Sequence, residues 1–432
     1  MRVQTIITLL LLSTWLAACT EPEPASVASA ASIDDTAREY VHLALELGEH
    51  EVGYIDAYIG PAEWQAAAST NPRSLNDIAR DVEILREKLQ RIKKTDSNTQ
   101  RISYLNKQLL SMETRVAMLQ GKQFSFNEET RLLYDAIAPH HDNAHFEATL
   151  AEIGAIIPGD SPLHVRVTSY KRRFEIPPDK LSAIIETVVE ECRTRTQQWI
   201  VLPEGERFTI EYVDDKPWSG YNWYQGANYS LLQINTDLPT ELGNVVNLGC
   251  HEGYPGHHVY NLMLEQRMVK QNGWMEFSVQ PLFSPQALLM EGSANFGTSM
   301  AFPGDSQLEY ERDVLFPMAG LDPNLAEPYF RFQQLQKKLS YASNHAAREY
   351  LDGRWSREQA IAWLVEYGLY TSERAEKRMD FIDTYRGYVI NYNLGRDMVR
   401  DYVARMSESE AERWQVFSEL LGSPSVPSGL VE

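Results

Sequence analysis

Three histidines and a glutamate lie within eight residues of this chain, in the segment 249–258, which reads GCHEGYPGHH. Imidazole nitrogens and carboxylate oxygens are common ligands of divalent metals such as zinc. In the motif H-E-x-x-H, two histidines four residues apart share one helix face, and the glutamate beside the first acts as a general base. Here the fourth residue after His251 is Pro255, so the second ligand must lie elsewhere.

Helix geometry narrows the choice of that ligand. A helix turns by about 100° per residue, so His257 cannot face the same side as His251 on an unbroken helix. Pro255 costs about 3 kcal/mol in a helix interior and Gly256 tolerates unusual backbone angles. We expect this pair to bulge outward, which makes His257 the effective partner. His258 is the second choice, because it lies roughly 10 Å further along the axis.

Two alternatives stay open for this segment. The Pro-Gly pair could simply end a helix and leave the histidines as polar surface or core residues. Cys250 could itself be a ligand, but its side chain leaves the face that carries His251. The density of donor groups favours a metal site, and a catalytic zinc then needs a third protein ligand.

The motif resembles that of the bacterial domain-of-unknown-function family numbered 885, whose members carry H-E-x-x-P-G-H-H. That family looks like a gluzincin, a zinc peptidase with a downstream glutamate ligand, and its substrates are largely unsettled. The resemblance covers most of the chain after the leader, through segments that read YIDAYIGP (54–61), KPWSG (216–220) and NTDLP (235–239). It implies one zinc ion and hydrolysis of a peptide or small amide substrate.

The third ligand is predicted downstream. Glu291 is a lone carboxylate within an apolar helical run, LLMEGSAN (288–295). Burying a carboxylate without a partner is costly, so we expect a charged group beside it. The run also matches the family's E-G-W-A segment, which implies that Glu291 binds zinc. The alternative is a structural glutamate bonded to Asn295.

The residue that stabilises the oxyanion is less well defined. Segments 385–388 and 392–395 resemble the family's P-G-Q-A-L-x-Y-K-x-G segment, with Tyr392 in place of its tyrosine. However, Arg386 and Tyr388 stand where Pro and Gln are usual, and the family's His before the Trp segment is replaced by Asp352. Phenols can donate to a developing oxyanion. The candidates are therefore Tyr385, Tyr388, Tyr392 and His345.

The elements that would position these residues are mostly helical. Apolar spacing predicts helices between 34 and 158, a long helix at 178–200, and C-terminal helices at 321–341, 356–367 and 374–406. Alternation predicts strands at 208–213 and 229–235, separated by an aromatic loop. In gluzincins an edge strand binds extended substrate, which implies a role for Leu231, Gln233 and Asn235. We predict a mainly α, elongated multi-helix, gluzincin-like fold with a small sheet beside the metal-site helix.

The start of the chain predicts export. An apolar run at 6–12 precedes LAAC (16–19), which resembles a lipoprotein signal that ends at a lipid-accepting Cys19. The run is too short to span a bilayer, and an ordinary cleaved signal would also give export. Thr20 in place of Asp favours the outer membrane, facing the periplasm. We predict a signal peptide at 1–19, a flexible tether at 20–33, a helical half at 34–177 and a catalytic half at 178–432, with its sheet at about 205–236.

Composition limits the partners. The net charge of −20 argues against nucleic acid and against electrostatic binding to anionic lipid, so membrane contact should come only through Cys19. Export permits a disulfide between Cys192 and Cys250, but two cysteines do not specify one. The histidines that follow Pro139 are interpreted as loop residues.

These observations predict a zinc-dependent peptide hydrolase of the cell envelope. Zinc would polarise the carbonyl and lower the pKa of a bound water, and Glu252 would take the proton of that water. One alternative is a lipoprotein in which zinc only stabilises the fold. Another is a metal-dependent hydrolase of a non-peptide amide.

Overall fold

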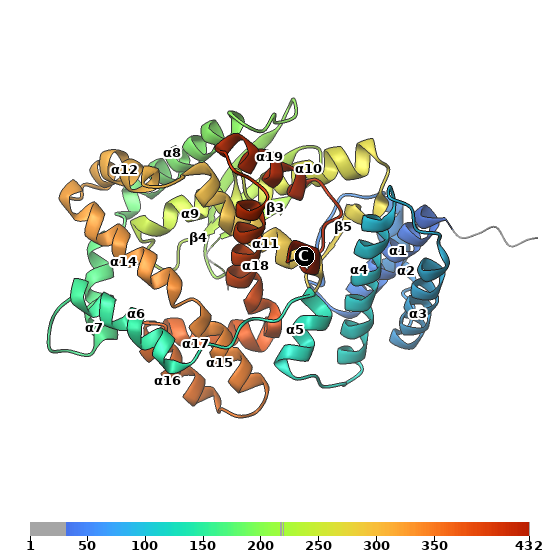
Figure 1. Ribbon diagram of the computed structural model, residues 1–432, viewed down its shortest axis with the longest axis horizontal. Coiled ribbons are helices and arrows are strands. Elements are labelled where there is room, and N and C mark those ends of the chain that lie inside the picture. The colour runs from blue at the N-terminus through green and yellow to red at the C-terminus, as the bar shows by residue number, and fades with distance from the viewer. Residues whose placement is uncertain (1–31, 217, 219, 432) are drawn as a thin grey trace, which may run out of the picture.

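The computed structural model describes residues 32–216, 218 and 220–431. The signal peptide, Cys19 and nearly all of the tether lie outside these residues. The described chain is mainly α, as the apolar spacing predicts, with only short strands (Figure 1).

The N-terminal half is a layer of helices that packs against the rest through one continuous core. Buried residues recur three and four apart along α1 and α4, which is the pattern of helices with one face in a core. Their bounds are α1 Ile33–His50, α2 Ala62–Thr70, α3 Leu75–Arg91, α4 Thr99–Leu119, α5 Phe126–Tyr134, α6 Asn143–Ile156 and α7 Leu163–Lys171. The long helix α8 (Pro178–Gln197) begins the second half.

Two small sheets connect this layer to the centre. β1 (Ile55–Tyr58) pairs antiparallel with β5 (Val279–Pro281), and the register shifts between Ile55 and Ala57. The second sheet has the order β2 (Arg207–Val213), β4 (Tyr229–Asn235), β3 (Gly220–Tyr224). β4 runs parallel to β2 and antiparallel to β3. The sheet lies beside α9 (Leu242–Glu252) and α10 (His257–Met263), as predicted.

Two predictions about this sheet are wrong. The segment expected to be an aromatic loop contains β3, because the aromatic residues alternate along an extended backbone that pairs with β4. β4 is the central strand, so the backbones of Leu231, Gln233 and Asn235 are already paired on both sides. They cannot bind extended substrate by main-chain pairing. The edge strand next to the metal-site helix is β3.

The C-terminal helices are shorter than their apolar periodicity predicts. The segment 374–406 is divided by a 3₁₀ turn, Arg386–Val389, where Arg386 has a positive φ of 50°. The segment 321–341 holds one helix and the start of the next. The bounds are α11 Pro285–Ala301, α12 Ser306–Tyr310, α13 Phe316–Ala319, α14 Ala326–Lys338, α15 Tyr341–Leu351, α16 Arg357–Tyr367, α17 Ser372–Tyr385, α18 Ile390–Arg405 and α19 Glu410–Leu421.

The centre of the molecule is the pair α11 and α18, which lie side by side (Figure 1). Gly292 and Gly395 face each other across this pair. A Cβ on Gly292 would lie 2.4 Å from the backbone carbon of Gly395, so only glycine allows this approach. Because Gly292 follows Glu291, the close contact also sets the position of that carboxylate.

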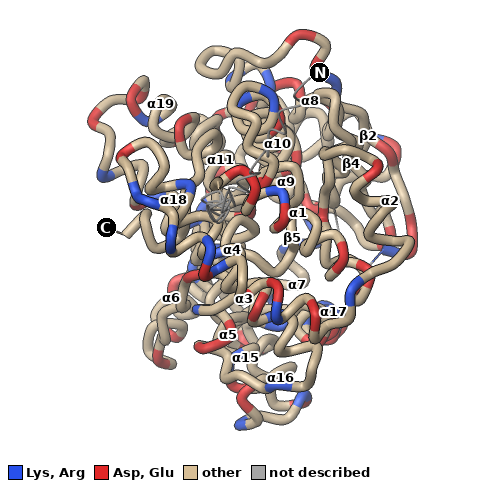
Figure 2. Tube along the Cα trace, turned by 90° about the vertical axis from the view of Figure 1, so that its right-hand side faces the viewer, with Lys and Arg blue, Asp and Glu red and all other residues tan. Residues whose placement is uncertain are grey.

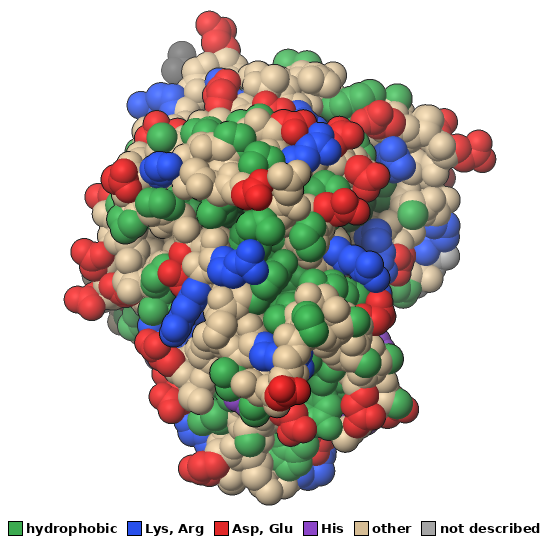
Figure 3. Space-filling view, turned by 90° about the vertical axis from the view of Figure 1, so that its left-hand side faces the viewer, with side chains coloured by type: hydrophobic (Ala, Val, Ile, Leu, Met, Phe, Trp, Pro, Cys, Tyr) green, Lys and Arg blue, Asp and Glu red, His purple; other side chains and the backbone are tan. Residues whose placement is uncertain are grey.

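The surface carries both signs of charge. Lys and Arg are interspersed with Asp and Glu along the described chain (Figure 2). The face in Figure 3 is hollowed near its centre, where hydrophobic side chains gather and Lys and Arg lie at the rim. Among the described helices, none combines the length and the apolar character needed to cross a membrane.

Candidate metal centre

The motif segment forms two helices joined by a buried turn. α9 ends at Glu252, and α10 begins at His257. Residues 253–256 are buried rather than looped outward, so the expected bulge on a continuous helix is wrong. The N–H of Gly256 donates to the carbonyl of Cys250 at 3.0 Å, and a Cβ on Gly256 would lie 1.8 Å from the carbonyl oxygen of His251. Only glycine allows this tight reversal, which folds α10 back against the end of α9.

This turn brings His251 and His257 to one carboxylate. Nε2 of His251 lies 3.3 Å from Oε2 of Glu291, and Nε2 of His257 lies 3.7 Å from the same oxygen. The two imidazole rings are nearly perpendicular, with centroids 4.5 Å apart. These are the three residues that the sequence predicts as ligands, and their donor atoms form one cluster.

The cluster fits a zinc ion. Ligand atoms about 2.0–2.1 Å from a tetrahedral zinc are separated by about 3.3 Å, close to the two distances here. Oε2 of Glu291 is buried and has no hydrogen-bond partner among the described residues. A buried oxygen without a donor is costly, and a cation would give it a partner. Two imidazoles and one carboxylate also form the ligand set of many catalytic zinc sites.

His258, the second choice, is occupied elsewhere. It is fully buried, with Nδ1 2.8 Å from the hydroxyl of Ser230 and Nε2 2.9 Å from Oε1 of Glu206. Both ring nitrogens are therefore bonded to groups outside the cluster. The His258 side chain ties α10 to the sheet and to the segment before β2.

The electrostatics of the cluster favour a bound cation. Burial opposes protonation of His251, but Glu291 and Glu252 outweigh it and raise the pKa of this histidine. Burial and the neighbouring His251 lower the pKa of His257 to about 4. Burial also opposes ionisation of Glu291, yet the two histidines and Tyr388 hold its pKa below the usual value. The lowered pKa values of Glu291 and His257 favour an ionised carboxylate and a neutral imidazole, which are the forms that bind a metal.

Glu252 is placed to act as a base. Its Oε1 lies 4.0 Å from Nε2 of His251. Burial raises the pKa of Glu252 to about 7; His251 opposes this rise, while Glu291 and Asp56 add to it. A carboxylate with a pKa near neutrality can both accept and return a proton.

Asp56 is a residue of this site that sequence reasoning missed. It lies on β1 where the register shifts, and such irregularities commonly re-aim a side chain. The hydroxyl of Tyr221 on β3 donates to Oδ1 of Asp56 at 2.7 Å, and burial raises the pKa of Asp56 to about 6. The one sequence feature that could have indicated Asp56 is its position as an acidic residue within the short, otherwise uncharged strand 55–58.

The three candidate tyrosines have different surroundings. The hydroxyl of Tyr388 donates to Oε1 of Glu291 at 2.8 Å, so it orients the carboxylate. Burial, followed by the nearby carboxylates of Glu291 and Glu252, raises the pKa of Tyr392 well above its ordinary value. The Tyr385 ring packs on Phe381 and Tyr388.

Asn295 and His345 do not take the positions that the sequence suggests for them. Asn295 donates to the backbone carbonyl of Glu291, not to its carboxylate. His345 lies in another cluster, with His140 and Glu349, so it is not grouped with the residues around Glu252.

A disulfide bond fixes α9 to α8. Cys192 on α8 is bonded to Cys250, with Cα atoms 5.5 Å apart. This bond excludes Cys250 as a metal ligand. It links the helix that carries His251 to the long helix α8.

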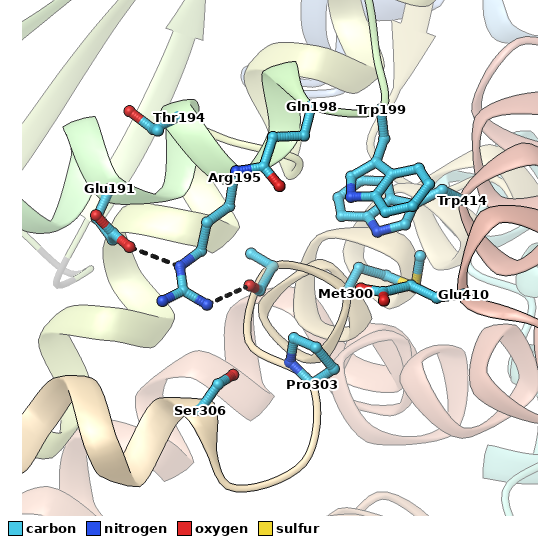
Figure 4. Close-up of a pocket in the computed structure, with 11 residues that line it drawn as sticks. Glu191, Thr194, Arg195, Gln198, Trp199, Met300, Pro303, Ser306, Glu410 and Trp414 are labelled. Carbon is cyan, nitrogen blue, oxygen red and sulfur yellow. Dashed lines mark hydrogen bonds and ion pairs between the residues drawn. The ribbon is translucent and has the colours of Figure 1, made fainter.

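A separate surface cavity of about 220 Å³ lies between α8, α11 and α19 (Figure 4). The rings of Trp199 and Trp414 are parallel there, with centroids 6.1 Å apart, and Arg195 donates to Glu191 at 2.7 Å. None of the lining residues belongs to the His251, His257 and Glu291 cluster.

Helices around a buried His-His-Glu cluster, with a small sheet at its side, define a mainly α protein with a candidate metal centre. No protein-family model matches the chain, and no curated protein matches it. The fold is shared with a "putative lipoprotein" from Colwellia psychrerythraea, at 16% identity and a TM-score of 0.54, over 85% of this chain and 70% of that one. It is also similar to a "putative lipoprotein of unknown function" from Shewanella oneidensis, at 12% identity and a TM-score of 0.50, over 92% and 82% of the two chains.

Proposed function

We propose that this protein is a zinc-dependent hydrolase of peptide or small amide bonds in the cell envelope. The observation that carries the proposal is the position of Glu252, a buried carboxylate beside a cluster of three metal-binding side chains. A structural zinc site is usually closed by four protein ligands, whereas three ligands leave a position open for chemistry. The cluster has three such groups, and the carboxylate of Glu252 lies beside it.

His251, His257 and Glu291 would hold the ion. When bound, zinc supplies a Lewis acid that polarises a carbonyl and acidifies water. Glu252 accepts the proton of the attacking water and returns it to the leaving amine, because its pKa of about 7 permits both transfers. Tyr392 is the candidate donor to the oxyanion, since Tyr388 is already bonded to Glu291.

The edge of the sheet supports a role in substrate binding. β3 is the strand next to the end of α9, where Nδ2 of Asn222 donates to the carbonyl of Glu252 at 2.5 Å. An extended substrate that pairs with a sheet edge beside the metal ligands would have its backbone near Glu252. This assignment replaces the one made for Leu231, Gln233 and Asn235.

We also propose that the chain is held to the membrane by a lipid on Cys19. The two solved structures reported above carry the description "putative lipoprotein", which fits the LAAC sequence at 16–19. The outer membrane, facing the periplasm, is the expected location.

The substitution Glu252→Gln tests the proposed chemistry. Glutamine keeps the size of the side chain but cannot take a proton, so hydrolysis of library peptides should fall by about 10²-fold or more. Zinc content and melting temperature should stay nearly unchanged, because Glu252 is not among the proposed ligands. The control is Glu190→Gln, an exposed carboxylate on α8. Equal rates for the Glu252 variant and the wild type would refute the mechanism, and a lack of wild-type activity on peptides and amides would favour a zinc-stabilised scaffold.

A further inference from the structure

A second group of metal-binding side chains lies where the loop before α6 meets α15, in the lower part of Figure 1. It consists of His140 from the loop, and His345 and Glu349 from α15. Each offers one donor atom, and these atoms all lie within 4.8 Å of one another. None of the three belongs to the cluster around Glu291.

The helical spacing on α15 places two of the proposed ligands on one face. His345 and Glu349 are four residues apart, so their side chains lie over one another on the same helix face. His140 approaches this face from the loop, with its ring centroid 5.3 Å from that of His345. One helix and one loop thus supply a three-donor set.

Other side chains hold the loop and the helix in place. The buried guanidinium of Arg348 on α15 donates to the carbonyl of Ala138 at 2.7 Å, two residues before His140. Arg354 donates to Oε1 of Glu349 at 2.9 Å and to Oε2 at 2.5 Å. A carboxylate has about four lone-pair positions, so both oxygens can still accept a cation. Groups that orient a ligand in this way are typical of metal sites.

His345 has an unsatisfied polar atom. Its Nδ1 is buried and has no hydrogen-bond partner among the described residues. The ring packs against both Trp355 and Trp363, with centroid distances of 5.1 and 4.5 Å. These indoles fix the imidazole, and coordination would give one of its nitrogens a partner.

We propose that His140, His345 and Glu349 form a second site for a divalent transition metal of the zinc class. Two nitrogens and one oxygen suit this class better than Mg²⁺ or Ca²⁺, which prefer oxygen ligands. The site binds more weakly than the cluster at Glu291, because His140 is exposed and the positive charge of Arg354 lies beside Glu349. A bound ion would join the loop of the N-terminal half to α15 of the C-terminal half.

Zinc binding to metal-free protein tests this site without reference to activity. Equilibrium dialysis against ZnCl₂, followed by elemental analysis, should give two equivalents for the wild type, one tight and one weaker. His140→Ala and His345→Ala should weaken the second equivalent by at least about 10-fold and keep the first. His257→Ala should do the opposite, and the remote control His164→Ala should keep both.

His345→Ala removes a partly buried side chain and could unfold the protein. His140 is exposed, so His140→Ala leaves no cavity in the core and tests the site by itself. Saturation of the wild type at one equivalent would overturn the second site. Full retention of the weaker equivalent by His140→Ala would also overturn it. Neither outcome affects the cluster at Glu291, whose test is the loss of the tight equivalent in His257→Ala.

Discussion

At the scale of single residues, the position of each ring nitrogen separates a proposed ligand from a structural histidine. Nε2 of His257 points to the buried oxygen of Glu291, whereas both nitrogens of His258 are bonded to Ser230 and Glu206. The two histidines are neighbours in sequence and have opposite surroundings. The buried turn before them produces this difference.

Metal content should therefore distinguish the two histidines. We expect purified protein to hold about one zinc per chain, and His251→Ala, His257→Ala and Glu291→Ala each to lose it, since three protein ligands define a catalytic zinc site. His258→Ala is the matched control and should largely keep its zinc, with reduced stability. Elemental analysis after dialysis against zinc-free buffer, which removes the weaker equivalent proposed at His140, provides the measurement. Full zinc retention by His257→Ala would show that the ligand set is wrong.

Tyr388 offers a finer test, because it touches the proposed ligand and not the ion. Removal of its hydroxyl in Tyr388→Phe takes away the 2.8 Å bond to Glu291. Loss of such an orienting bond typically weakens metal binding by about 10- to 100-fold. Competition with a chelator gives the affinity, and Tyr385→Phe is the control on the neighbouring turn. An unchanged affinity would mean that Tyr388 does not support the ligand.

At the scale of elements, the helical segment that follows α12 begins with Glu311, a buried carboxylate with few hydrogen-bond partners. Oε1 of Glu311 accepts a bond from Gln307 at 2.8 Å, but Oε2 has no partner among the described residues. Burial raises the pKa of Glu311 to about 7, and the charge of Lys337 only partly offsets this rise. The folded state therefore holds a proton here that the unfolded chain releases near pH 4.5.

This difference fixes the sign of a pH effect. Between about pH 4.5 and 7 the folded protein binds one more proton than the unfolded chain, so this group lowers stability as the pH rises. Glu311→Gln removes the ionisation and should raise the free energy of unfolding at pH 8, by up to about 3 kcal/mol, with little change at pH 4.5. Urea unfolding across this range measures it, with the exposed Glu309→Gln on the same helix as control. A constant difference between variant and wild type at all pH values would contradict the assignment.

The elements also show what the sequence could predict. Helices such as α8 and strands β2 and β4 follow from periodicity. His251 and His257 follow from residue type and spacing, whereas Glu291 follows from its lone position in an apolar run and from the family resemblance. The predicted bulge is wrong because helix geometry alone does not show that Pro255 packs against Gly297, or that Gly256 lies against the backbone of His251. The edge strand was wrong because strand order depends on long-range pairing. His140 and Glu349 are far apart in the sequence and close only in the folded chain, so no local sequence pattern predicts that they are neighbours.

At the scale of the whole molecule, the described chain is one packed body with a shared core, and the candidate metal centre draws on both predicted halves. Asp56 comes from β1, while Glu252 and Glu291 come from α9 and α11. The Asp56 to Tyr221 bond joins the two small sheets across the site. The N-terminal half is therefore part of the site and not only a support for it.

We expect a single lipid anchor to hold this packed body to a membrane. The LAAC sequence at 16–19 resembles a lipoprotein signal, and a net charge of −20 opposes binding to anionic lipid, so a lipid on Cys19 should provide the attachment. Cys19→Ala should yield a soluble exported protein or an unprocessed precursor, whereas the control Thr20→Ala should stay membrane-bound. Fractionation of cells by ultracentrifugation distinguishes these outcomes, and an inhibitor of lipoprotein signal processing should produce the precursor from the wild type. A chain that starts at Ser32 should be soluble; if it still sediments with membranes, another surface of the protein mediates attachment.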